Sequence, residues 1–288
     1  MRLCRYNEQR LGVVEGALGS EMQVRDATAA LDALPAVRYP LPAHDPLIAA
    51  LPQLRGAIAA AAAKARPIPL ADVRLLSPVA NPGKIVAAPV NYRKHLEEAL
   101  ADKGIHHGRL VEEIHKIGMF LKATSSLVGP SEGVRLVKTD RRNDHEVELA
   151  VVIGKRGRNI SREQAMEHVA GYCIGLDITT RGPEERSLRK SADSYSVLGP
   201  WLVTADEFGD PSRVRISIKV NGVVRQDANT EDLVMPIPEL IEYMSAFYSL
   251  HPGDVIMTGT PQGVGPIKPG DVMEAWIERI GSMQVRVS

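Results

Sequence analysis

The sequence predicts an α+β protein built mainly on antiparallel β-strands, with helices at the periphery. From residue 84 onward, short apolar or alternating segments recur, each bounded by glycine, proline or asparagine, as is typical of strands. Asn221 and Gly222 separate two of these segments, and this dipeptide favours a two-residue hairpin turn. The 24 glycines and 20 prolines among 288 residues fit many short strands joined by tight turns.

The first 75 residues are expected to form a small N-terminal domain ahead of a main domain at residues 80–288. Within it, RLGVVEG predicts a short hairpin, and DATAALDALP predicts a helix that stops at Pro35, because proline disrupts a continuing helix. The segment LIAALPQLRGAIAAAAAKA predicts a longer helix with Pro52 near its first turn. Four prolines in PIPLADVRLLSPVANPGK then mark an extended connection to the main domain.

The main domain contains more predicted strands than predicted helices. Strands are expected in KIVAAPV, HEVELAVVIG, RVRISIKV, VVRQ, DVIMTG, VMEAWIERI and MQVRVS. Helices are expected in NYRKHLEEALADKG, SREQAMEHVAGY and PIPELIEYMSAFYSL, the last of which ends near Pro252 and Gly253. This order favours a mainly antiparallel sheet with a few helices on its outside.

Composition and charge argue against several classes of function. The 35 lysines and arginines balance 35 aspartates and glutamates, so no net field points to nucleic acid. Cys4 and Cys173 lie too far apart for a disulfide framework or a zinc motif and are expected to be reduced thiols. The most apolar stretch, Ala57–Ala63, is short and predicts a surface-packed helix, not a membrane span. We therefore expect a cytoplasmic protein without nucleic-acid or membrane partners.

Two glutamates stand side by side on one predicted strand. In DHEVELAVVIG, Glu146 and Glu148 point to the same face, because side chains alternate along a strand. The following run, Leu149–Ile153, is apolar on both faces, which indicates that the strand enters the interior. Two neighbouring buried carboxylates raise each other's pKa unless a cation neutralises them. A hard cation that prefers oxygen ligands, such as Mg²⁺, is the natural candidate.

A third carboxylate, Asp177, ends the apolar strand-like run Tyr172–Leu176. A strand that ends in an acid places that side chain at the edge of a sheet. Three carboxylates suit Mg²⁺, because this ion leaves its other coordination positions to water or substrate. The alternative is that Glu146 and Glu148 form the solvated face of an amphipathic strand, and that Asp177 caps the helix after it. Spacing alone leaves both interpretations open.

Eight motifs, in their order along the chain, resemble the pattern of the fumarylacetoacetate hydrolase family. They are NPGKIVAAPVNYRKHLEE, FLKATSSLVGP, DHEVELAVVIGK, GYCIGLDITTR, KSADSYSVLGPWLVT, VNGVVRQ, LHPGDVIMTGTPQGVG and KPGDVMEAWIERIG. The similarity covers about residues 80–288, and because it rests on many co-linear motifs it is more specific than any one of them. Residues 1–75 are similar to the variable N-terminal segment of such proteins.

The resemblance implies a fold and a set of site residues. The implied fold is an antiparallel β roll or sandwich of the family's type with a Mg²⁺ or Mn²⁺ site, usually in a homodimer. Members cleave C–C bonds in acylpyruvates and related β-diketo acids, and some relatives isomerise, decarboxylate or dehydrate similar oxo acids. The implied residues are the metal ligands Glu146, Glu148 and Asp177, the catalytic His95, Glu98 and Lys190, and the substrate-pocket residues Lys122 and Thr260, to which we add Arg181.

These residues would together support hydrolysis of a 1,3-dioxo acid. A chelating metal acts as a Lewis acid on the substrate. His95 takes a proton from water while Glu98 orients the imidazole, and their i, i+3 spacing places both on one helix face. Lys190 stabilises the developing oxyanion. We therefore expect a Mg²⁺-dependent C–C bond hydrolase that acts on an acylpyruvate or related β-diketo acid, in the catabolism of aromatic compounds or organic acids.

Three positions depart from the family pattern and bear on the substrate. Lys94 stands where an acid often precedes the histidine, which puts a fourth carboxylate ligand in doubt. Gly182 follows the arginine where the family usually has an aspartate, and Ala192 replaces a bulky aromatic residue. A pocket opened at Ala192, with Lys94, Lys190 and Arg181 as its basic residues, would suit a larger or more anionic substrate.

Each assignment has a simpler alternative. His95 and Glu98 could be a helical surface pair, Lys122 and Lys190 could be exposed to solvent, and GTPQGVG could be only a tight turn. The segment between His95 and Phe120 is longer than the family pattern leads us to expect, and it predicts a lid over the pocket.

Two other functions compete with hydrolysis. One keeps the fold and the metal but isomerises or decarboxylates an unsaturated oxo-dicarboxylic acid. The other is a non-catalytic oligomeric binding protein, which is disfavoured because such a protein has no need of three carboxylates, a histidine dyad and a lysine together.

Overall fold

A large mixed sheet forms the centre of the computed structural model, which describes residues 1–19, 21–106 and 112–288. Within these residues the sheet has twelve strands, ten of which follow the order β4-β3-β2-β1-β13-β11-β10-β16-β6-β7, while β5 pairs with β1 and β8 pairs with β13. All pairs are antiparallel except β13 with β8 and β16 with β6. The strands are β1 (Arg2–Tyr6), β2 (Arg10–Glu15), β3 (Gln23–Asp26), β4 (Pro67–Pro69), β5 (Leu75–Leu76), β6 (Ile85–Ala87), β7 (Phe120–Lys122), β8 (Leu127–Val128), β10 (Val147–Ile153), β11 (Val169–Asp177), β13 (Ser196–Thr204) and β16 (Val255–Met257).

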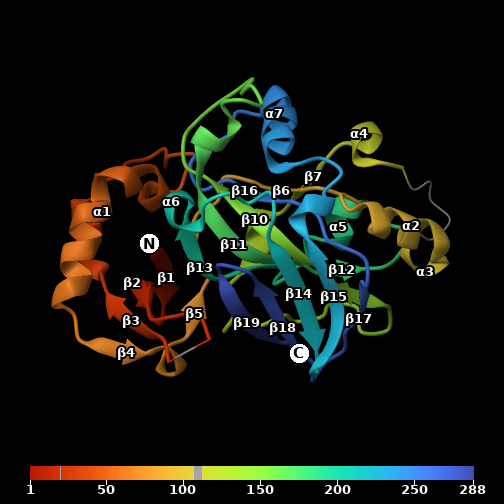
Figure 1. Cartoon of the computed structure of the whole chain (residues 1–288), viewed down its shortest axis with the longest axis horizontal. Helices are drawn as coiled ribbons and strands as arrows, with labels where there is room; N and C mark the ends of the chain where they lie inside the picture. Colours follow the sequence, from red (N-terminus) through yellow and green to blue (C-terminus); the bar gives the residue numbers. More distant parts are fainter. Residues whose placement is uncertain (20, 107–111) are drawn as a thin grey trace.

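Two smaller sheets are antiparallel throughout the described chain. One has the order β12 (Thr179–Thr180), β9 (Asn143–His145) and β17 (Gly265–Pro266). The other has the order β15 (Val223–Asn229), β14 (Arg215–Val220), β18 (Val272–Ile277) and β19 (Gly281–Arg286), and Figure 1 shows it in front of the large sheet. The mainly antiparallel α+β architecture predicted from the sequence is therefore confirmed.

The hairpin between β14 and β15 turns where the sequence predicts it. Asn221 and Gly222 both have positive φ, 50° and 80°, as the two central residues of a type I′ turn require. Val220 pairs with Val223 directly across the turn.

The central strand β10 is buried on both faces. Val147, Leu149 and Val151 belong to one hydrophobic core cluster, whereas Ala150 and Val152 belong to a second one on the opposite face. This arrangement explains the continuous apolar run in the sequence, because a strand covered on both sides has no solvent-facing positions. It also means that carboxylates at the start of the strand lie at the border of a dry core.

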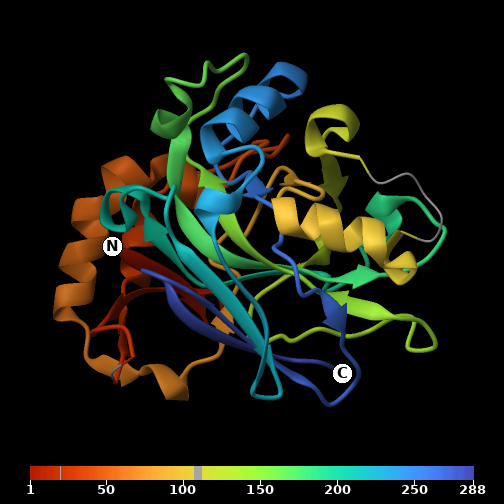
Figure 2. The same ribbon diagram turned by 45° about the vertical axis from the view of Figure 1, so that its right-hand side comes forward.

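Helices cover the outside of the sheets. The α-helices are α1 (Pro46–Lys64), α2 (Arg93–Ala101), α3 (Lys103–His106), α4 (Ile114–Ile117), α5 (Arg186–Arg189), α6 (Ala205–Phe208) and α7 (Ile237–Phe247), and the 3₁₀ helices are η1 (Thr28–Ala33), η2 (Leu70–Asp72), η3 (Thr124–Ser126), η4 (Ala165–His168) and η5 (Thr230–Asp232). Figure 2 shows α1 and the N-terminal strands on one side of the molecule and α2 to α5 on the other.

Helix α1 begins at an aspartate cap, where the backbone N–H of Ile48 donates to Asp45 Oδ1 over 3.0 Å. Its apolar face, which includes Leu51, Leu54 and Ile58, packs in the second core cluster together with residues of the large sheet. By length and hydropathy alone α1 also has the properties of a membrane span. Only 28% of that apolar window is buried, so α1 is a surface helix that packs one face against the sheet.

Two predicted helices are wrong in type. SREQAMEHVAGY contains only the short 3₁₀ helix η4, and β11 begins at Val169 within the same segment. DATAALDALP likewise forms the 3₁₀ helix η1 instead of an α-helix. In the first case, β11 is buried between β10 and β13, and the apolar residues of a fully buried strand carry no period that separates them from a helix.

The N-terminal segment joins the main part through backbone pairing. β1 pairs with β13 at Arg2–Val203 and Leu3–Leu202, so β1 to β4 extend the same sheet that carries β10 and β11. The division into domains at residues 1–75 and 80–288 stays a prediction.

Candidate metal centre and active site

Three carboxylates meet where β10 and β11 run side by side. Glu146 directly precedes β10, Glu148 lies within it, and Asp177 is the last residue of β11. The backbone N–H of Asp177 donates to the carbonyl oxygen of Glu146 over 2.9 Å, which aligns the two strands at this point. Carboxylate oxygens of the three residues lie within 4.8 Å of one another. Their exposed fractions are 5%, 1% and 1%, so the alternative of a solvated strand face is wrong.

Buried cations surround this cluster. Lys190 Nζ donates to Glu146 Oε2 and to Asp177 Oδ2, over 2.7 Å in both cases, and to Thr179 Oγ1 over 2.6 Å. Arg181 Nη2 donates to Glu146 Oε1 over 3.0 Å. Burial raises the pKa of Glu146, but the charges of Lys190 and Arg181 outweigh it and bring the pKa down to about 2. Glu146 is therefore held as a carboxylate.

Lys122 lies on the other side of Asp177. Its ammonium donates a hydrogen bond to Asp177 Oδ1 and another to the carbonyl oxygen of Tyr195, the second over 3.0 Å. Burial lowers the pKa of Lys122, and the charge of Asp177 opposes this shift without cancelling it. The alternative of a solvent-exposed lysine is wrong for both Lys122 and Lys190, which are 3% and 6% exposed.

Glu148 has a different electrostatic environment from Glu146. Burial raises its pKa well above the ordinary value of a glutamate, and the charges of Asp177 and Glu146 raise it further. The backbone N–H of Gly259 donates to Glu148 Oε2 over 2.7 Å and offsets only part of this effect. A carboxyl group in this position becomes a stable anion when a cation joins it. The three residues together therefore fit a divalent cation that takes oxygen ligands.

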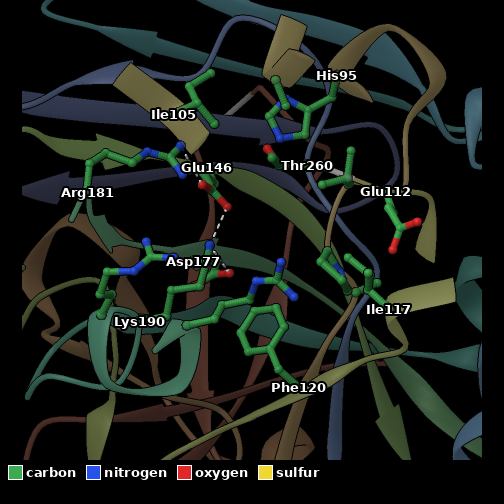
Figure 3. Close-up of a pocket in the computed structure, with 16 residues that line it drawn as sticks. His95, Ile105, Glu112, Ile117, Phe120, Glu146, Asp177, Arg181, Lys190 and Thr260 are labelled. Atoms are coloured by element: carbon green, nitrogen blue, oxygen red, sulfur yellow. Dashed lines mark hydrogen bonds and ion pairs between the residues drawn. The ribbon is translucent and has the colours of Figure 1, made fainter. Parts of the chain in front are cut away.

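His95 and Glu98 form a hydrogen-bonded pair on α2. His95 Nδ1 lies 2.8 Å from Glu98 Oε2, and His95 is 5% exposed. A carboxylate only accepts hydrogen bonds, so Nδ1 carries the proton of this contact, and in a neutral ring the lone pair is then on Nε2. Figure 3 shows the ring of His95 directed toward Glu146 and Thr260. The alternative of an exposed helical pair is therefore wrong for the histidine.

The loop TGTPQGVG holds both parts of the site in place. Gly259 contacts Glu148 as described, and the backbone N–H of Gly263 donates to Glu98 Oε1 over 2.9 Å. Thr260 Oγ1 donates to the carbonyl oxygen of Val147 over 2.9 Å, which ties the loop to β10. This segment is thus more than a turn, because it connects the dyad to the carboxylate strand.

Gly263 is expected to tolerate no side chain. Its φ is +94°, and a Cβ at this position would lie 2.0 Å from the carbonyl oxygen of Arg225, so the loop must move in Gly263→Ala. We expect kcat to fall roughly 100-fold, because a displacement of about 1 Å in a positioning group has an effect of that order. Gly270→Ala is the matched control, since φ there is also +94° but nothing lies within 4 Å of the added Cβ. Equal losses in steady-state kcat for the two variants would contradict this role.

His95 and two of the three carboxylates, Glu146 and Asp177, line one pocket. Its lining residues are Ala88, Pro89, Val90, His95, Ala99, Ile105, Glu112, Ile117, Phe120, Glu146, Asp177, Arg181, Arg186, Arg189, Lys190 and Thr260. Figure 3 shows His95 and Phe120 on opposite sides of Glu146 and Asp177. The walls of the pocket consist of charged side chains of the cluster and of apolar side chains from the segment that runs from α2 to β7.

The three residues expected to bind the substrate differ in whether they line the pocket. Thr260 lines the pocket, whereas Lys122 lies behind Asp177 and is not among the lining residues. Arg181 lines the pocket and also pairs with Asp144 Oδ2 over 2.7 Å, in addition to Glu146. These contacts make Arg181 a support of the carboxylate cluster, and contact with a substrate stays a prediction.

The expectation of a pocket opened at Ala192 is corrected. Neither Ala192 nor Lys94 lines the pocket: Ala192 packs against the main core cluster, and Lys94 is exposed on α2. Besides Arg181 and Lys190, two further cations line the pocket. They are Arg186 and Arg189 on α5, which lie outside the motifs of the family resemblance.

Part of the predicted lid lines the pocket. Ala99, Ile105, Glu112 and Ile117 all belong to the segment between His95 and Phe120. Residues 107–111 lie outside the described residues, so the prediction of a lid is not tested over its whole length.

Other supporting residues were not predicted. Thr179 Oγ1 donates to Glu146 Oε1 over 3.1 Å. The amide of Gln226 accepts from the backbone N–H of Val147 over 3.1 Å and donates to Thr260 Oγ1 over 2.8 Å, so it joins the carboxylate strand to the glycine loop. Gln226 is the buried residue of an otherwise exposed or half-buried strand β15, and nothing in the segment VVRQ marks it in the sequence.

The fold and this buried carboxylate centre define the class of protein: the chain belongs to the fumarylacetoacetate hydrolase family. Residues 84–288 match the family model described as fumarylacetoacetate (FAA) hydrolase C-terminal. The family resemblance predicted from the motifs is thereby confirmed.

Among individual proteins, the chain is 59% identical to the maleylpyruvate hydrolase of Aquipseudomonas alcaligenes over 289 residues, which cover 100% of this chain and 99% of the relative. The crystal structure of maleylpyruvate hydrolase from Sphingobium sp. SYK-6 in complex with manganese (II) ion and pyruvate matches with a TM-score of 0.82 and 41% identity, over 100% of this chain and 98% of that chain. The 5-carboxymethyl-2-hydroxymuconate delta-isomerase of Mycobacterium smegmatis matches with a TM-score of 0.72 and 31% identity, over 100% of this chain and 99% of that chain.

Proposed function

We propose that this protein is a metal-dependent hydrolase that cleaves a C–C bond of an acylpyruvate, in the catabolism of aromatic compounds. The observation that carries the proposal is one pocket lined by His95, Glu146 and Asp177. His95 is paired with Glu98, and Glu146 and Asp177 form a buried cluster of three carboxylates with Glu148. The end-to-end identity of 59% with a maleylpyruvate hydrolase supports it and makes maleylpyruvate the first substrate to test.

Glu146, Glu148 and Asp177 would hold the metal, either Mg²⁺ or Mn²⁺. The bound ion supplies Lewis-acid chemistry to an oxo acid in the pocket. Both metals accept carboxylate oxygens, and the solved relative with manganese and pyruvate supports the assignment.

His95 is the proposed general base. With Nδ1 protonated and held by Glu98, Nε2 can take a proton from a water molecule in the pocket. Glu98 is a positioning residue that also stabilises the imidazolium. The backbone N–H of Gly263 donates a hydrogen bond that keeps Glu98 in place. Lys190 places its ammonium beside Glu146 and Asp177, where it can stabilise negative charge on a substrate oxygen.

The proposed reaction consumes one water. Its oxygen forms a bond to the acyl carbonyl carbon, and the bond from that carbon to the methylene of the pyruvate part breaks. The electron pair stays with the methylene carbon, which then takes up a proton. Maleylpyruvate would give maleate and pyruvate. The same site could isomerise or decarboxylate an unsaturated oxo-dicarboxylic acid, but the lower identity of the isomerase relative, 31%, favours hydrolysis.

Two parts of the proposal concern the setting of the enzyme. A cytoplasmic location agrees with Cys4 and Cys173, which are both buried free thiols. A homodimer is proposed from the family resemblance, and size-exclusion chromatography with light scattering tests it.

Product analysis tests the proposed reaction. We expect maleylpyruvate with Mg²⁺ or Mn²⁺ to lose its enol absorbance and to yield pyruvate and maleate in equal amounts. A product with the mass of the substrate would favour isomerisation instead. Release of carbon dioxide would indicate decarboxylation, and no turnover of maleylpyruvate, fumarylpyruvate or acetylpyruvate would contradict the proposed class.

A further inference from the structure

A chain of alternating charges leads away from the carboxylate cluster. Arg181 Nη2 donates to Glu146 Oε1 over 3.0 Å, and Arg181 Nε donates to Asp144 Oδ2 over 2.7 Å. The other oxygen of Asp144, Oδ1, accepts from Arg142 Nε over 2.7 Å. Asp144 is 0% exposed and Arg181 is 7% exposed, so this part of the chain is buried. Each oxygen of Asp144 therefore holds one arginine.

The chain of charges ends at the helix that carries the dyad. Arg142 Nη1 donates to Asp102 Oδ2 over 3.0 Å, and Asp102 directly follows α2. The backbone N–H of Asp102 donates to the carbonyl oxygen of Glu98 over 2.9 Å, so Asp102 is tied to the last turn of the helix. Asp102 Oδ1 accepts from the backbone N–H of Gly104 over 2.7 Å. Arg142 thus joins the end of α2 to the buried network.

Arg142 can bridge two carboxylates because its donors are spread over a flat guanidinium group. Its Nε contacts Asp144 while its Nη1 contacts Asp102. A lysine offers one compact charge in place of this fork, so it is a poor substitute at such a position. The carbonyl oxygen of Arg142 also accepts from the backbone N–H of Arg181 over 2.8 Å, which aligns the two arginines through the main chain.

The placement of α2 matters for the proposed reaction, because His95 lies in its first turn. The helix has nine residues, and both of its buried residues, His95 and Ala99, line the pocket. A shift at the end of so short a helix tilts the face that carries these residues. Displacement of a reacting group by about 1 Å has a large effect on the rate. The contact between Arg142 and Asp102 therefore bears on where His95 lies.

We propose that Arg142 is a positioning residue that couples the helix of the general base to the metal centre. It links the end of α2 to Asp144, and Arg181 continues the link to Glu146. The inference rests on the proposed function, because it takes His95 as the base and Glu146 as a metal ligand. A general base must lie within hydrogen-bond reach of the water that it activates, so a displaced α2 reduces kcat more than it weakens substrate binding.

Asp102→Asn tests the outer contact without touching the buried part. The side chain of Asp102 is 42% exposed, and exposed ion pairs contribute little to stability, so Tm should stay close to that of the wild type. Asparagine can still accept from Gly104 but loses the charge that holds Arg142. We expect kcat for maleylpyruvate to fall roughly fivefold while KM stays within about twofold. Asp102→Glu, which keeps the carboxylate, should recover most of this loss.

Changes at Arg142 remove the bridge itself. We expect kcat to fall roughly 10-fold in Arg142→Lys and roughly 10- to 100-fold in Arg142→Met. Combining Arg142→Met with Asp102→Asn should slow the enzyme no further than Arg142→Met does, because both changes break the same link. Arg55→Met is the matched control: it breaks another exposed ion pair, with Asp206 at 2.6 Å, on a helix that does not line the pocket, and it should keep wild-type kcat.

Hydrogen exchange gives a readout that needs no turnover. With Mn²⁺ present, the backbone amides of residues 93–101 should exchange at least about threefold faster in Asp102→Asn than in the wild type, while those of β10 and β11 stay unchanged. The increase in Tm that Mn²⁺ produces should also stay unchanged, because Asp102 is not part of the carboxylate cluster. A general loss of structure would instead affect the strands and the metal response together.

The outcomes distinguish the two proposals. If the wild type hydrolyses no acylpyruvate, the proposed function fails. If the wild type is active and Asp102→Asn and Arg142→Lys keep kcat within twofold, the inference is overturned. Exchange of α2 at the wild-type rate in Asp102→Asn, or an equal loss of kcat in Arg55→Met, would overturn it as well. A lower kcat with an unchanged KM, together with faster exchange confined to α2, supports it.

Discussion

Glu148→Gln is expected to abolish metal binding while the fold stays intact. Glutamine keeps the shape of the side chain but removes the charge that a divalent cation requires. In the wild type, metal should raise the free energy of unfolding by about 2.7 kcal/mol when its concentration is 100 times Kd. This increase, measured by thermal or urea unfolding with and without Mn²⁺, should disappear in the variant. We expect kcat/KM to fall by on the order of 1,000-fold.

The metal-free variant provides a sharper test. Glu148 is buried beside the like charges of Asp177 and Glu146, which raise its pKa. Removing its ionisable group should therefore leave the metal-free protein at least as stable as the wild type, in contrast to most changes of buried residues. Glu97→Gln is the matched control, because it makes the same change on an exposed position of α2. A full metal response in Glu148→Gln would exclude this residue as a ligand.

His95→Ala is expected to remove catalysis without removing the metal. Loss of a general base reduces kcat by roughly 100- to 10,000-fold. His95 is not part of the carboxylate cluster, so the metal-induced increase in unfolding free energy should remain close to that of the wild type. Rapid mixing of enzyme, metal and acylpyruvate then measures kcat directly.

A second histidine serves as the control for this experiment. His115 is 46% exposed, its Nε2 lies 3.0 Å from Glu239 Oε1, and it is not among the residues that line the pocket. His115→Ala should keep wild-type kcat. If His95→Ala retains full activity with a metal response, the dyad has no role in the reaction and another base must act.

The carboxylate centre could be predicted because its pattern is local. Alternation along one strand places Glu146 and Glu148 on one side, and the apolar run after them indicates burial. Asp177 follows from the same logic on the neighbouring strand. The pairing of β10 with β11, which brings Asp177 next to Glu146, is not local, and here the family resemblance supplied what spacing could not.

The supporting contacts could not be predicted, because they join distant parts of the chain. Gly263 and Glu98 are 165 residues apart, and Gln226 and Val147 are 79 residues apart. Such pairs depend on the register of whole sheets, which no short pattern encodes. The same limitation affected Arg181: the sequence shows a cation near the site, but only the folded chain shows that it contacts Asp144 and Glu146.

The fold was predicted well where turns are chemically specific and less well where strands are fully buried. Asn221 and Gly222 fix a hairpin because both adopt positive φ. The segment before Asp177 was predicted in part as a helix, since a strand covered on both faces lacks the alternation that identifies strands at a surface. Short 3₁₀ helices such as η1 and η4 are too brief to show a clear period.

A crystal structure of the protein grown with Mn²⁺ and pyruvate tests the central claim most directly, because anomalous scattering locates the metal without assumptions about ligands. We expect one strong peak between Glu146, Glu148 and Asp177, with an oxygen of each at about 2.1 Å and with pyruvate beside it in the pocket that contains His95. A peak at any other place, or a protein saturated with Mn²⁺ that shows none among these three carboxylates, would contradict the proposed metal centre and the hydrolase mechanism built on it.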